Sequence, residues 1–389
     1  MIHYDQVLTR LRQQSLFREL RNIDEIQGPV VKVGDHYVVN FASNDYLGLS
    51  QHPSVKAAAK TAIDRYGVGS GASRLVSGSL SPHTKFEEDI AAFKGTQSAL
   101  LFSTGYAAAV GTICSLVDRG DVIILDKLAH ACLIDGAKLS GAFLRVFPHN
   151  NVAKLKHHLE WAERAHPQGR ILMLTESVFS MDGDLGDLAA IVELKNQFRA
   201  LLFVDEAHAT GVIGPQGSGL VNALGLKPQI EVQMGTLSKA FGVSGGFICS
   251  SRTFIELLVN KARSFIYSTA LPSACAAAAS AALQILRSRE GDVLRSQLWN
   301  NVFLLGKSLA TTPRKNPEPT SPIFPIVIGD EAKTLRLAES LLEHGFLVPA
   351  IRYPTVARGA ARIRIAMSSL HTPEQIDALS GAIMASRSE

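Results

Sequence analysis

The sequence has few cysteines, and they lie far apart. Cys114, Cys132, Cys249 and Cys275 form no Cys-x-x-Cys pair, so neither a metal site nor a disulfide framework is indicated, and we expect buried, reduced thiols. The sequence also lacks an excess of charge of one sign. Its 39 Lys and Arg residues balance 35 Asp and Glu residues to a net charge of +4, without a basic run, which argues against a nucleic-acid partner.

Long apolar runs and internal repeats are absent as well. No apolar stretch reaches the length of a membrane span, and the segment Met1–Asp5 does not open a secretory signal. Hydrophobic residues make up 46% of the 389 residues and charged residues 19%, which is typical of a folded globular protein. We therefore expect a cytoplasmic protein with a large core and no membrane contact.

What the sequence does have is a regular alternation of short apolar segments and helical segments. The expected strands are Ser98–Phe102, Val122–Leu125, Leu144–Phe147, Ile171–Thr175, Leu201–Val204, Glu231–Met234 and Gly246–Cys249. The expected helices between them are Pro53–Tyr66, Pro82–Phe93, Tyr106–Val117, Val152–Ala165 and Leu188–Phe198. This alternation predicts an α/β fold with a mostly parallel seven-stranded sheet between helices.

The two ends of the chain show other patterns. Apolar residues at helical spacing predict an N-terminal helix, and Gly34-Asp35 between two apolar segments predicts a hairpin. Alanine-rich Ala274–Leu286 predicts a helix that leads to a small α+β domain. Within that part of the chain, the proline-rich segment Thr311–Pro325 predicts an irregular connection. The expected divisions are an N-terminal helix and arm (1–45), a large domain (46–275) and a small C-terminal domain (276–389).

A lysine in a loop of small residues is the strongest chemical signal. Lys239 lies in Gly235–Gly246, and Asp205 ends an apolar strand 34 residues earlier (239 − 205). A lysine amine can form a Schiff base with pyridoxal phosphate, and a carboxylate can keep the pyridine nitrogen of that cofactor protonated. Taken singly, the lysine would be a solvated loop residue and the aspartate a cap or turn residue. The two in this order favour the cofactor.

Other residues could complete such a site. Gly105 and Tyr106 follow a predicted strand and open a helix, where backbone N–H groups bind phosphate; the alternative is an ordinary turn. The hydroxyl of Thr236 could assist them. His130, just past the strand that ends at Leu125, could stack on the pyridine ring or relay protons, or be a structural histidine.

Three further residues are candidates for contacts with the cofactor or a substrate. His208 and Ser180 follow strands and could reach the cofactor. Arg352 could hold a substrate carboxylate, unless it forms a surface ion pair. The loop Gly67–Arg74 lacks the third glycine of a dinucleotide site and follows a helix, so a Rossmann site is excluded.

These motifs, in this order, resemble the α-oxoamine synthases, a family of fold-type I pyridoxal phosphate enzymes, over nearly the whole chain. The matching segments are Asn44–Leu49, Gly69–Arg74, Leu128–Gly136, Thr175–Asp184, Val204–Gly211 and the lysine loop. The resemblance implies a PLP-dependent transferase that is a homodimer with its sites at the subunit interface, to which Tyr267–Thr269 would contribute.

The resemblance also implies residue roles. Lys239, His130 and Asp205 would be catalytic, since the lysine holds the cofactor and moves the Cα proton. The cofactor would be held by Gly105, Tyr106, His130, Ser180, Asp205, His208, Thr236 and Lys239. The substrates would be held by Arg18 (or Arg21 in another alignment), Asn44, His130, Arg352 and Thr355. Glu206 varies in the family and would carry no chemistry.

Within the family, Leu16–Arg21, Ser77–His83 and Ile351–Thr355 favour the member that condenses L-alanine with a pimeloyl thioester, carried by acyl carrier protein or coenzyme A, in biotin biosynthesis. Glycine C-acetyltransferase and other members of the family are the alternatives. A cofactor-free regulatory homologue is the non-enzyme alternative, against which the joint presence of Lys239, Asp205 and His130 argues.

Overall fold

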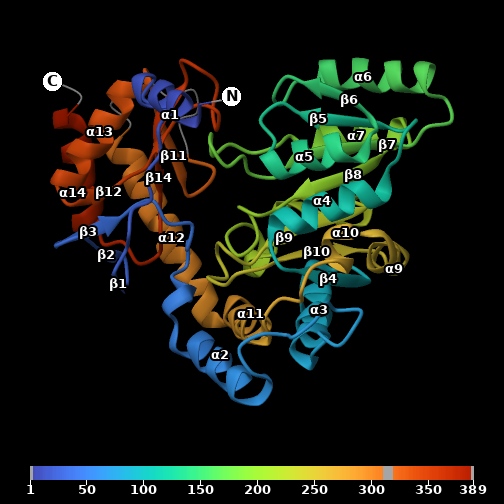
Figure 1. The fold of residues 1–389 in the computed structure, drawn as a ribbon, viewed down its shortest axis with the longest axis horizontal. Coiled ribbons are helices and arrows are strands. Elements are labelled where there is room, and N and C mark those ends of the chain that lie inside the picture. Colours follow the sequence, from blue (N-terminus) through green and yellow to red (C-terminus); the bar gives the residue numbers. More distant parts are fainter. Residues whose placement is uncertain (1–2, 310–318, 387–389) are drawn as a thin grey trace. The chain divides into compact units, whose positions relative to one another are not determined.

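The computed structural model describes residues 3–309 and 319–386. The chain forms two compact units, coloured along the sequence in Figure 1. The small unit comprises Met1–Gly48, Met181–Gly183 and Leu294–Glu389; the large unit comprises Leu49–Ser180 and Asp184–Val293. The domain limits expected from the sequence (1–45, 46–275 and 276–389) stay predictions, and most of the expected connection at Thr311–Pro325 lies outside the described residues.

The large unit is built on a seven-stranded sheet in the order β4-β10-β9-β8-β7-β5-β6. The strands are β4 (Ser98–Phe102), β5 (Val122–Asp126), β6 (Phe143–Phe147), β7 (Ile171–Glu176), β8 (Leu201–Asp205), β9 (Val232–Thr236) and β10 (Gly246–Ser250). Only β10 is antiparallel to its neighbours β4 and β9; the other pairs are parallel. The predicted sheet is thus confirmed, with small shifts at the strand ends.

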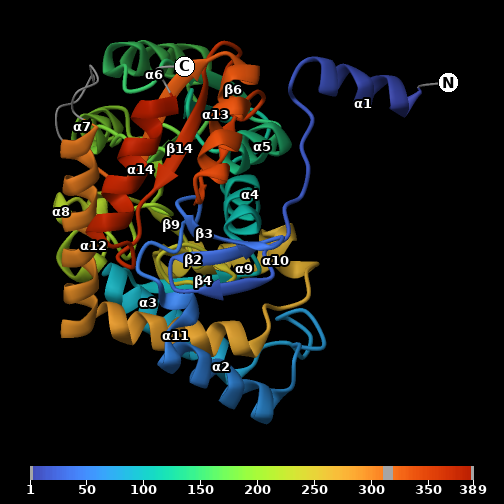
Figure 2. The same cartoon turned by 90° about the vertical axis from the view of Figure 1, so that its left-hand side faces the viewer.

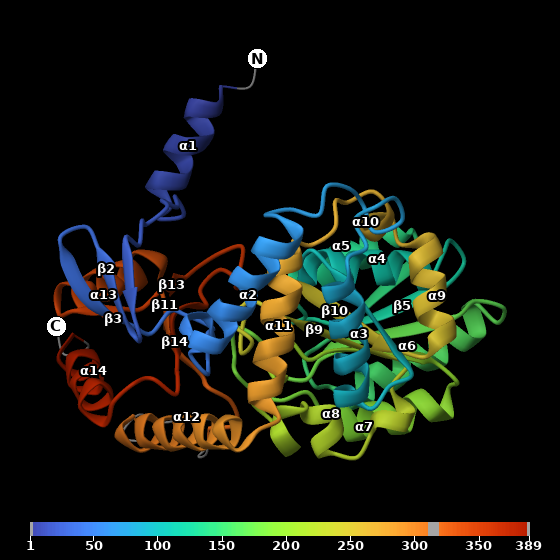
Figure 3. The same cartoon turned by 90° about the horizontal axis from the view of Figure 1, so that it is seen from below.

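Helices cover both faces of this sheet. The helices of the large unit are α2 (Pro53–Tyr66), α3 (Ser81–Lys94), α4 (Gly105–Leu116), α5 (Ala131–Ser140), α6 (Val152–Ala165), α7 (Leu188–Gln197), α8 (Leu220–Ala223), α9 (Arg252–Lys261), α10 (Arg263–Ile266) and α11 (Ser273–Leu286). Figure 3 shows α4 and α5 on one face and α7 and α8 on the other. Because both faces are covered, the central strands β5, β7 and β8 are almost wholly buried and polar chemistry is confined to their ends.

Small residues allow α4 to lie close to the sheet. Ala108, Ala109 and Ile113 are fully buried in the core cluster that α4 forms with the strands. At Gly111 a Cβ would lie 2.2 Å from the Ser264 hydroxyl, so a larger residue would displace that side chain. This close packing fixes where α4 begins, and its first turn is part of the candidate site described below.

The small unit joins the two ends of the chain. One sheet has the order β1-β2-β3-β12, made from β1 (Glu25–Gln27), β2 (Val30–Val33), β3 (His36–Asn40) and β12 (Phe346–Leu347). A second has the order β11-β14-β13, made from β11 (Ile323–Gly329), β14 (Ala361–Ala366) and β13 (Ala350–Ile351). The predicted hairpin is β2–β3, and β3 also pairs in parallel with β12.

Four helices complete the description: α1 (Tyr4–Gln13), α12 (Arg289–Ser308), α13 (Glu331–Glu343) and α14 (Pro373–Ser386). Figure 2 shows α13 and α14 side by side with β14 visible between them, and the two helices bury Leu337, Leu341 and Ile376. By contrast, α1 buries none of its residues and extends away from the rest of its unit. Among the described residues, no helix combines the length and the apolar character that a membrane crossing requires.

A buried ion pair supports the end of β8. The ammonium of Lys94 and the carboxylate of Glu206 form a salt bridge with side chains 1% and 0% exposed. Lys94 also donates to the Ser218 carbonyl at 2.7 Å, and Glu206 accepts from the backbone N–H of Val221 at 2.9 Å. Glu206, expected to carry no chemistry, therefore has a structural role beside Asp205, because each charge compensates the desolvation of the other.

We expect Lys94→Met to lower the free energy of unfolding by about 3–5 kcal/mol, since it leaves the Glu206 carboxylate buried and unpaired. The double variant Lys94→Met/Glu206→Gln should lose less than the single variant, because glutamine keeps the acceptor for Val221 without a charge. Urea denaturation of the three proteins measures this. A double variant less stable than Lys94→Met would contradict the role of the pair.

Candidate active site

Seven of the predicted residues line one cavity of about 210 Å³ in the large unit. The cavity lies at the carboxyl ends of the parallel strands, and its walls come from the first turn of α4, the loop after β5 and the ends of β7, β8 and β9. The lining residues are Thr104, Gly105, Tyr106, His130, Cys132, Glu176, Asp205, Ala207, His208, Met234, Thr236, Ser238 and Lys239. A larger hollow, about 630 Å³, lies beside the amino ends of β7 and β8 and contains none of the predicted residues.

Asp205 is the last residue of β8 and is only 4% exposed. Its Oδ1 accepts a hydrogen bond from the backbone N–H of Ala207 at 2.8 Å. Burial raises the pKa of Asp205, whereas the positive charge of Lys239 and the Ala207 hydrogen bond act in the opposite direction. A carboxylate held in this way can compensate a positively charged group in the cavity.

Glu176 stands next to Asp205 because β7 and β8 are parallel and pair these two residues in register. Its carboxylate accepts the backbone N–H of His130. Burial raises the pKa of Glu176 well above its ordinary value, and the charge of Asp205 raises it further. Two adjacent buried carboxyl groups are not both ionised at low cost, so we infer that Glu176 holds the proton and Asp205 the negative charge.

Lys239 is presented by a tight turn after β9. The N–H of Gly242 donates to the Lys239 carbonyl at 2.8 Å, and the N–H of Val243 donates to the Leu237 carbonyl at 2.8 Å. Gly242 has φ +68°, and a Cβ there would lie 2.2 Å from the backbone nitrogen of Ser50, so the turn requires glycine. This turn directs the lysine side chain into the cavity that Asp205 also lines.

An anion-binding end is formed by α4 and the hydroxyls that face it. Gly105 begins α4, whose N-cap Thr104 accepts the N–H of Ala107 at 3.0 Å. A Cβ on Gly105 would lie 2.9 Å from Met234 Cε and 3.4 Å from Thr236 Oγ1, so glycine keeps this space open. The Thr236 hydroxyl lies 2.9 Å from that of Ser238. Helix N-terminal N–H groups with hydroxyls beside them suit a phosphate group.

The remaining predicted cofactor residues differ in their placement. Tyr106 is 48% exposed, and its hydroxyl donates to Asp135 at 2.5 Å. His208 is buried and lines the cavity. Ser180 is also buried, on the loop after β7, but it is not among the described residues that line the cavity.

The predicted substrate residues Arg18, Asn44, Arg352 and Thr355 lie in the small unit. Arg352 is 7% exposed and donates to the carbonyls of Ser15 and Phe17, so it is no surface ion pair. Its Nε is buried without a hydrogen-bond partner among the described residues. Desolvation lowers the pKa of Arg352, and the positive charge of Arg18 lowers it further. Two neighbouring guanidinium groups, one with an unpaired N–H, favour an anionic ligand.

Arg18 and Asn44 are each held by a neighbour in the small unit. Arg18 lies 3.4 Å from Thr355 Oγ1. The Asn44 Oδ1 accepts two hydrogen bonds from the guanidinium of Arg364, each at 3.1 Å, and one from the Tyr46 hydroxyl at 3.2 Å. The amide of Asn44 is therefore fixed in orientation.

Sequence reasoning assigned no role to Glu176, Cys132 or Arg364. The rule that parallel strands bring their carboxyl ends together could have identified Glu176, because it ends β7 as Asp205 ends β8. No local signal marks Arg364 inside β14. Within residues 3–309 and 319–386, no group of three or more His, Cys, Asp or Glu side chains is placed to hold a metal ion.

A histidine between two carboxylates links the end of β5 to the loop after β7. His149 Nδ1 lies 3.1 Å from Asp126, which ends β5, and its Nε2 lies 2.8 Å from Asp184, on the loop after β7. Burial alone would lower the pKa of His149, but hydrogen bonds to Asp126 and Asp184 raise it from 6.5 to about 10. The ring is therefore an imidazolium at neutral pH and links the His130 loop to the Ser180 loop.

Because the folded state raises the pKa of His149, this stabilisation is complete below pH 6.5 and is lost as the pH rises to about 10. We expect the difference in Tm between the wild type and His149→Asn to shrink over that range. His157→Asn, at an exposed position on α6, is the control and should show no such trend. Thermal unfolding at a series of pH values measures the effect, and a constant difference in Tm would show that His149 carries no charge in the folded protein.

Comparison of the sequence with known proteins supports a pyridoxal phosphate site in this cavity. Residues 36–383 match the family model described as aminotransferase class I and II. The 8-amino-7-oxononanoate synthase of Geobacter sulfurreducens is 45% identical over 370 residues, which cover 95% of this chain and 94% of the relative.

Solved structures resemble the chain as well. A serine palmitoyltransferase variant from S. paucimobilis with bound PLP has a TM-score of 0.92 at 28% identity and covers 98% of this chain and 96% of its own. The 8-amino-7-oxononanoate synthase of Francisella tularensis has a TM-score of 0.76 at 30% identity, covering 90% and 97%.

The fold and the cavity thus define a class of PLP-dependent transferases, and the chain belongs to the aminotransferase class I and II family. Within that family, relatives that match nearly the whole chain at 43–45% identity are 8-amino-7-oxononanoate synthases. The expected fold type and cofactor, pyridoxal 5′-phosphate, are confirmed by this membership.

Proposed function

We propose that the chain catalyses the decarboxylative condensation of L-alanine with a pimeloyl thioester, on acyl carrier protein or coenzyme A, to give 8-amino-7-oxononanoate, CO2 and the free thiol in biotin biosynthesis. The observation that carries the proposal is the single cavity that unites Lys239, Asp205, His130 and the start of α4. Full-length relatives with this name, at 41–45% identity, support the choice of substrates.

The cavity suits pyridoxal phosphate by its donor set. The N-terminus of α4 with Thr236 and Ser238 supplies hydrogen-bond donors for a phosphate, and the open space at Gly105 admits it. Asp205 would pair with the protonated ring nitrogen, and Lys239 would bond to the aldehyde carbon. When bound, the cofactor withdraws electrons from the carbon next to the substrate amine.

The residues of the chain then have separate tasks. Lys239 Nζ takes the proton from the alanine Cα and later returns one to the product, as a general base and acid. Asp205 would keep the ring nitrogen protonated, because that proton would add to the compensation of its buried negative charge. His130, which lines the same cavity, would cover the cofactor ring and orient the acyl substrate. Arg352 and Asn44 take the alanine carboxylate, and Arg18 and Thr355 the acyl substrate.

We expect Lys239→Ala to reduce turnover by at least about 100-fold, because it removes the proton-transfer group and the covalent anchor together. Formation of 8-amino-7-oxononanoate from L-alanine and a pimeloyl thioester gives the rate. Borohydride reduction followed by peptide mapping shows whether the wild-type lysine carries the cofactor. Lys60→Ala, at an exposed position on α2, is the control and should leave both readouts unchanged. Near-normal turnover of Lys239→Ala would falsify the assignment.

Glycine C-acetyltransferase and other α-oxoamine synthases are the alternative functions, and the high TM-score of serine palmitoyltransferase shows how closely such enzymes share the fold. A methyl group on the amino acid contributes only about 1–3 kcal/mol of discrimination. Turnover with alanine, glycine and serine against pimeloyl, acetyl, succinyl and long-chain acyl thioesters separates them. Activity with glycine and acetyl-CoA, but none with alanine and a pimeloyl thioester, would select glycine C-acetyltransferase.

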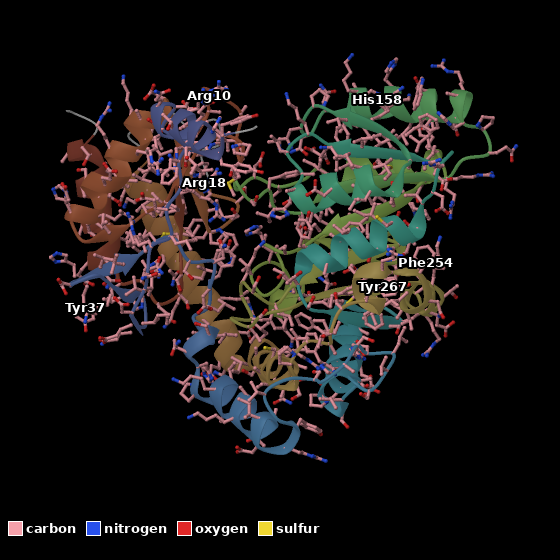
Figure 4. The ribbon with its side chains drawn as sticks, in the orientation of Figure 1. Arg10, Arg18, Tyr37, His158, Phe254 and Tyr267 are labelled. Carbon is pink, nitrogen blue, oxygen red and sulfur yellow. The ribbon has the colours of Figure 1, made fainter. Side chains whose placement is uncertain are left out.

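We also propose that the chain acts as a homodimer, as its resemblance to the α-oxoamine synthases implies. Apolar side chains gather on the surface of the large unit around the loop of residues 67–80 and the end of α10. Val68, Val76 and Tyr267 are 78%, 79% and 72% exposed, and Ala270 donates to the Ala72 carbonyl at 3.0 Å, which joins the two segments. Figure 4 labels Tyr267 at this surface. An exposed apolar surface of this kind is typical of an interface.

We expect Val76→Asp to weaken the dimer at least about 10-fold, because the new carboxylate would be desolvated at the interface. Val293→Asp is the matched control, since Val293 is 49% exposed on α12, outside this surface. Sedimentation velocity over a range of concentrations measures both. A monomeric wild type, or equal weakening by the two variants, would count against this interface.

A further inference from the structure

The imidazole of His130 is held on one side by the helix that follows it. His130 is the N-cap of α5, and its Nδ1 accepts the backbone N–H of Cys132 at 3.3 Å. The Cys132 Sγ lies 3.0 Å from the same nitrogen. A backbone N–H is only ever a donor, so this long contact favours a lone pair over a proton on Nδ1. This contact fixes the direction of the thiol hydrogen bond as well.

The alternative, a thiolate paired with an imidazolium, does not suit the surroundings. It would put a proton on Nδ1, facing the backbone N–H that now donates to it. Cys132 is 2% exposed, and burial raises the pKa of its thiol. The nearby carboxyl groups of Asp205 and Glu176 raise the pKa of Cys132 further, because a thiolate beside the negative charge of Asp205 would be repelled. The sulfur therefore keeps its proton and donates it to Nδ1.

The rest of His130 is fixed by a second contact. Its backbone N–H donates to Glu176, so the residue is held at the backbone by β7 and at the ring by α5. Partial desolvation lowers the pKa of His130, and the charge of Lys239 lowers it further, against the opposing effect of Asp205. A neutral imidazole whose Nδ1 is an acceptor carries its single proton on Nε2.

We propose that Cys132 is a positioning residue, whose S–H···Nδ1 hydrogen bond holds His130 in the Nε2–H tautomer and so makes its ring a hydrogen-bond donor toward the reacting substrate. This inference rests on the proposed function for the identity of that substrate. A donor at Nε2 suits an oxygen that gains negative charge, such as the carbonyl oxygen of the acyl thioester under attack. It also leaves the Cα proton to Lys239, since Nε2 has no lone pair with which to accept it.

Serine and alanine at position 132 separate positioning from simple packing. Cys132→Ser keeps an O–H donor beside Nδ1, whereas Cys132→Ala leaves only the weaker backbone contact. Cys114→Ala is the matched control, because Cys114 is a half-buried free cysteine on α4 whose Sγ lies 3.6 Å from the Gly136 carbonyl and that does not line the cavity. All four proteins are prepared as holoenzymes.

The tautomer is read directly by ¹⁵N NMR of histidine-labelled holoenzyme without substrate, with the His130 signals assigned from their absence in His130→Asn. We expect an unprotonated Nδ1 and a protonated Nε2 in the wild type, Cys132→Ser and Cys114→Ala, and a mixture of tautomers in Cys132→Ala. In parallel, kcat of Cys132→Ala should fall roughly five-fold, the factor for one lost neutral hydrogen bond, with rescue by serine.

A protonated Nδ1 in the wild type would overturn the proposal, and so would a Cys132→Ala variant with the wild-type tautomer and pH profile of kcat. Because the NMR experiment contains no substrate, its result stands apart from the proposed reaction. Wild-type enzyme that is inactive with L-alanine and every pimeloyl thioester would remove the proposed function while leaving the tautomer result in place.

Discussion

A buried carboxylate at the end of β8 is the constraint on which this site depends. Asp205 is nearly inaccessible to water, and its negative charge would be costly without compensation. Lys239 and the N–H of Ala207 provide part of that compensation. The parallel register of β7 and β8 places Glu176 beside Asp205. Because burial and the charge of Asp205 raise its pKa, Glu176 retains its proton. The electrostatics of the cavity therefore follow from one sheet edge, where adjacent parallel strands bring their terminal acids together.

The other end of the cavity is suited to an anion. There the positive electrostatic potential comes from backbone and hydroxyl dipoles and not from a charged side chain. The first turn of α4, the glycine at 105 and the hydroxyls of Thr236 and Ser238 provide these dipoles. Between the two ends, His130 is held by contacts to Glu176 and Cys132, and His149 ties neighbouring loops together. Rigid support of this kind keeps reactive groups in place before substrate arrives.

Much of the fold was predictable, because buried strands and helices show characteristic spacings of apolar residues in the sequence. The strands of the large unit are short apolar runs, and α2 and α6 have the bounds that their periodicity predicted. Other elements were missed. No helix was expected at α12, whose charged residues lie in its first two turns and at its C-terminal end, or at α5, which follows His130. The grouping of the N-terminal arm with the C-terminal segments could not be read from local pattern, since β3 pairs with β12 some 300 residues away (346 − 39 = 307).

The sequence by itself determined the chemistry that Lys239 and Asp205 can perform, because a lysine amine and a carboxylate bring their reactivity to any fold. It also determined the order of strands and helices, because the period of apolar residues is set within each segment. Only the tertiary structure decided that Glu176 lies beside Asp205 and that Arg364 donates a hydrogen bond to Asn44. It also decided that Arg352 is buried and does not lie on the surface. Such contacts join residues distant in sequence. They are fixed by packing and by the pairing of strands, which leave no periodic signal in the chain.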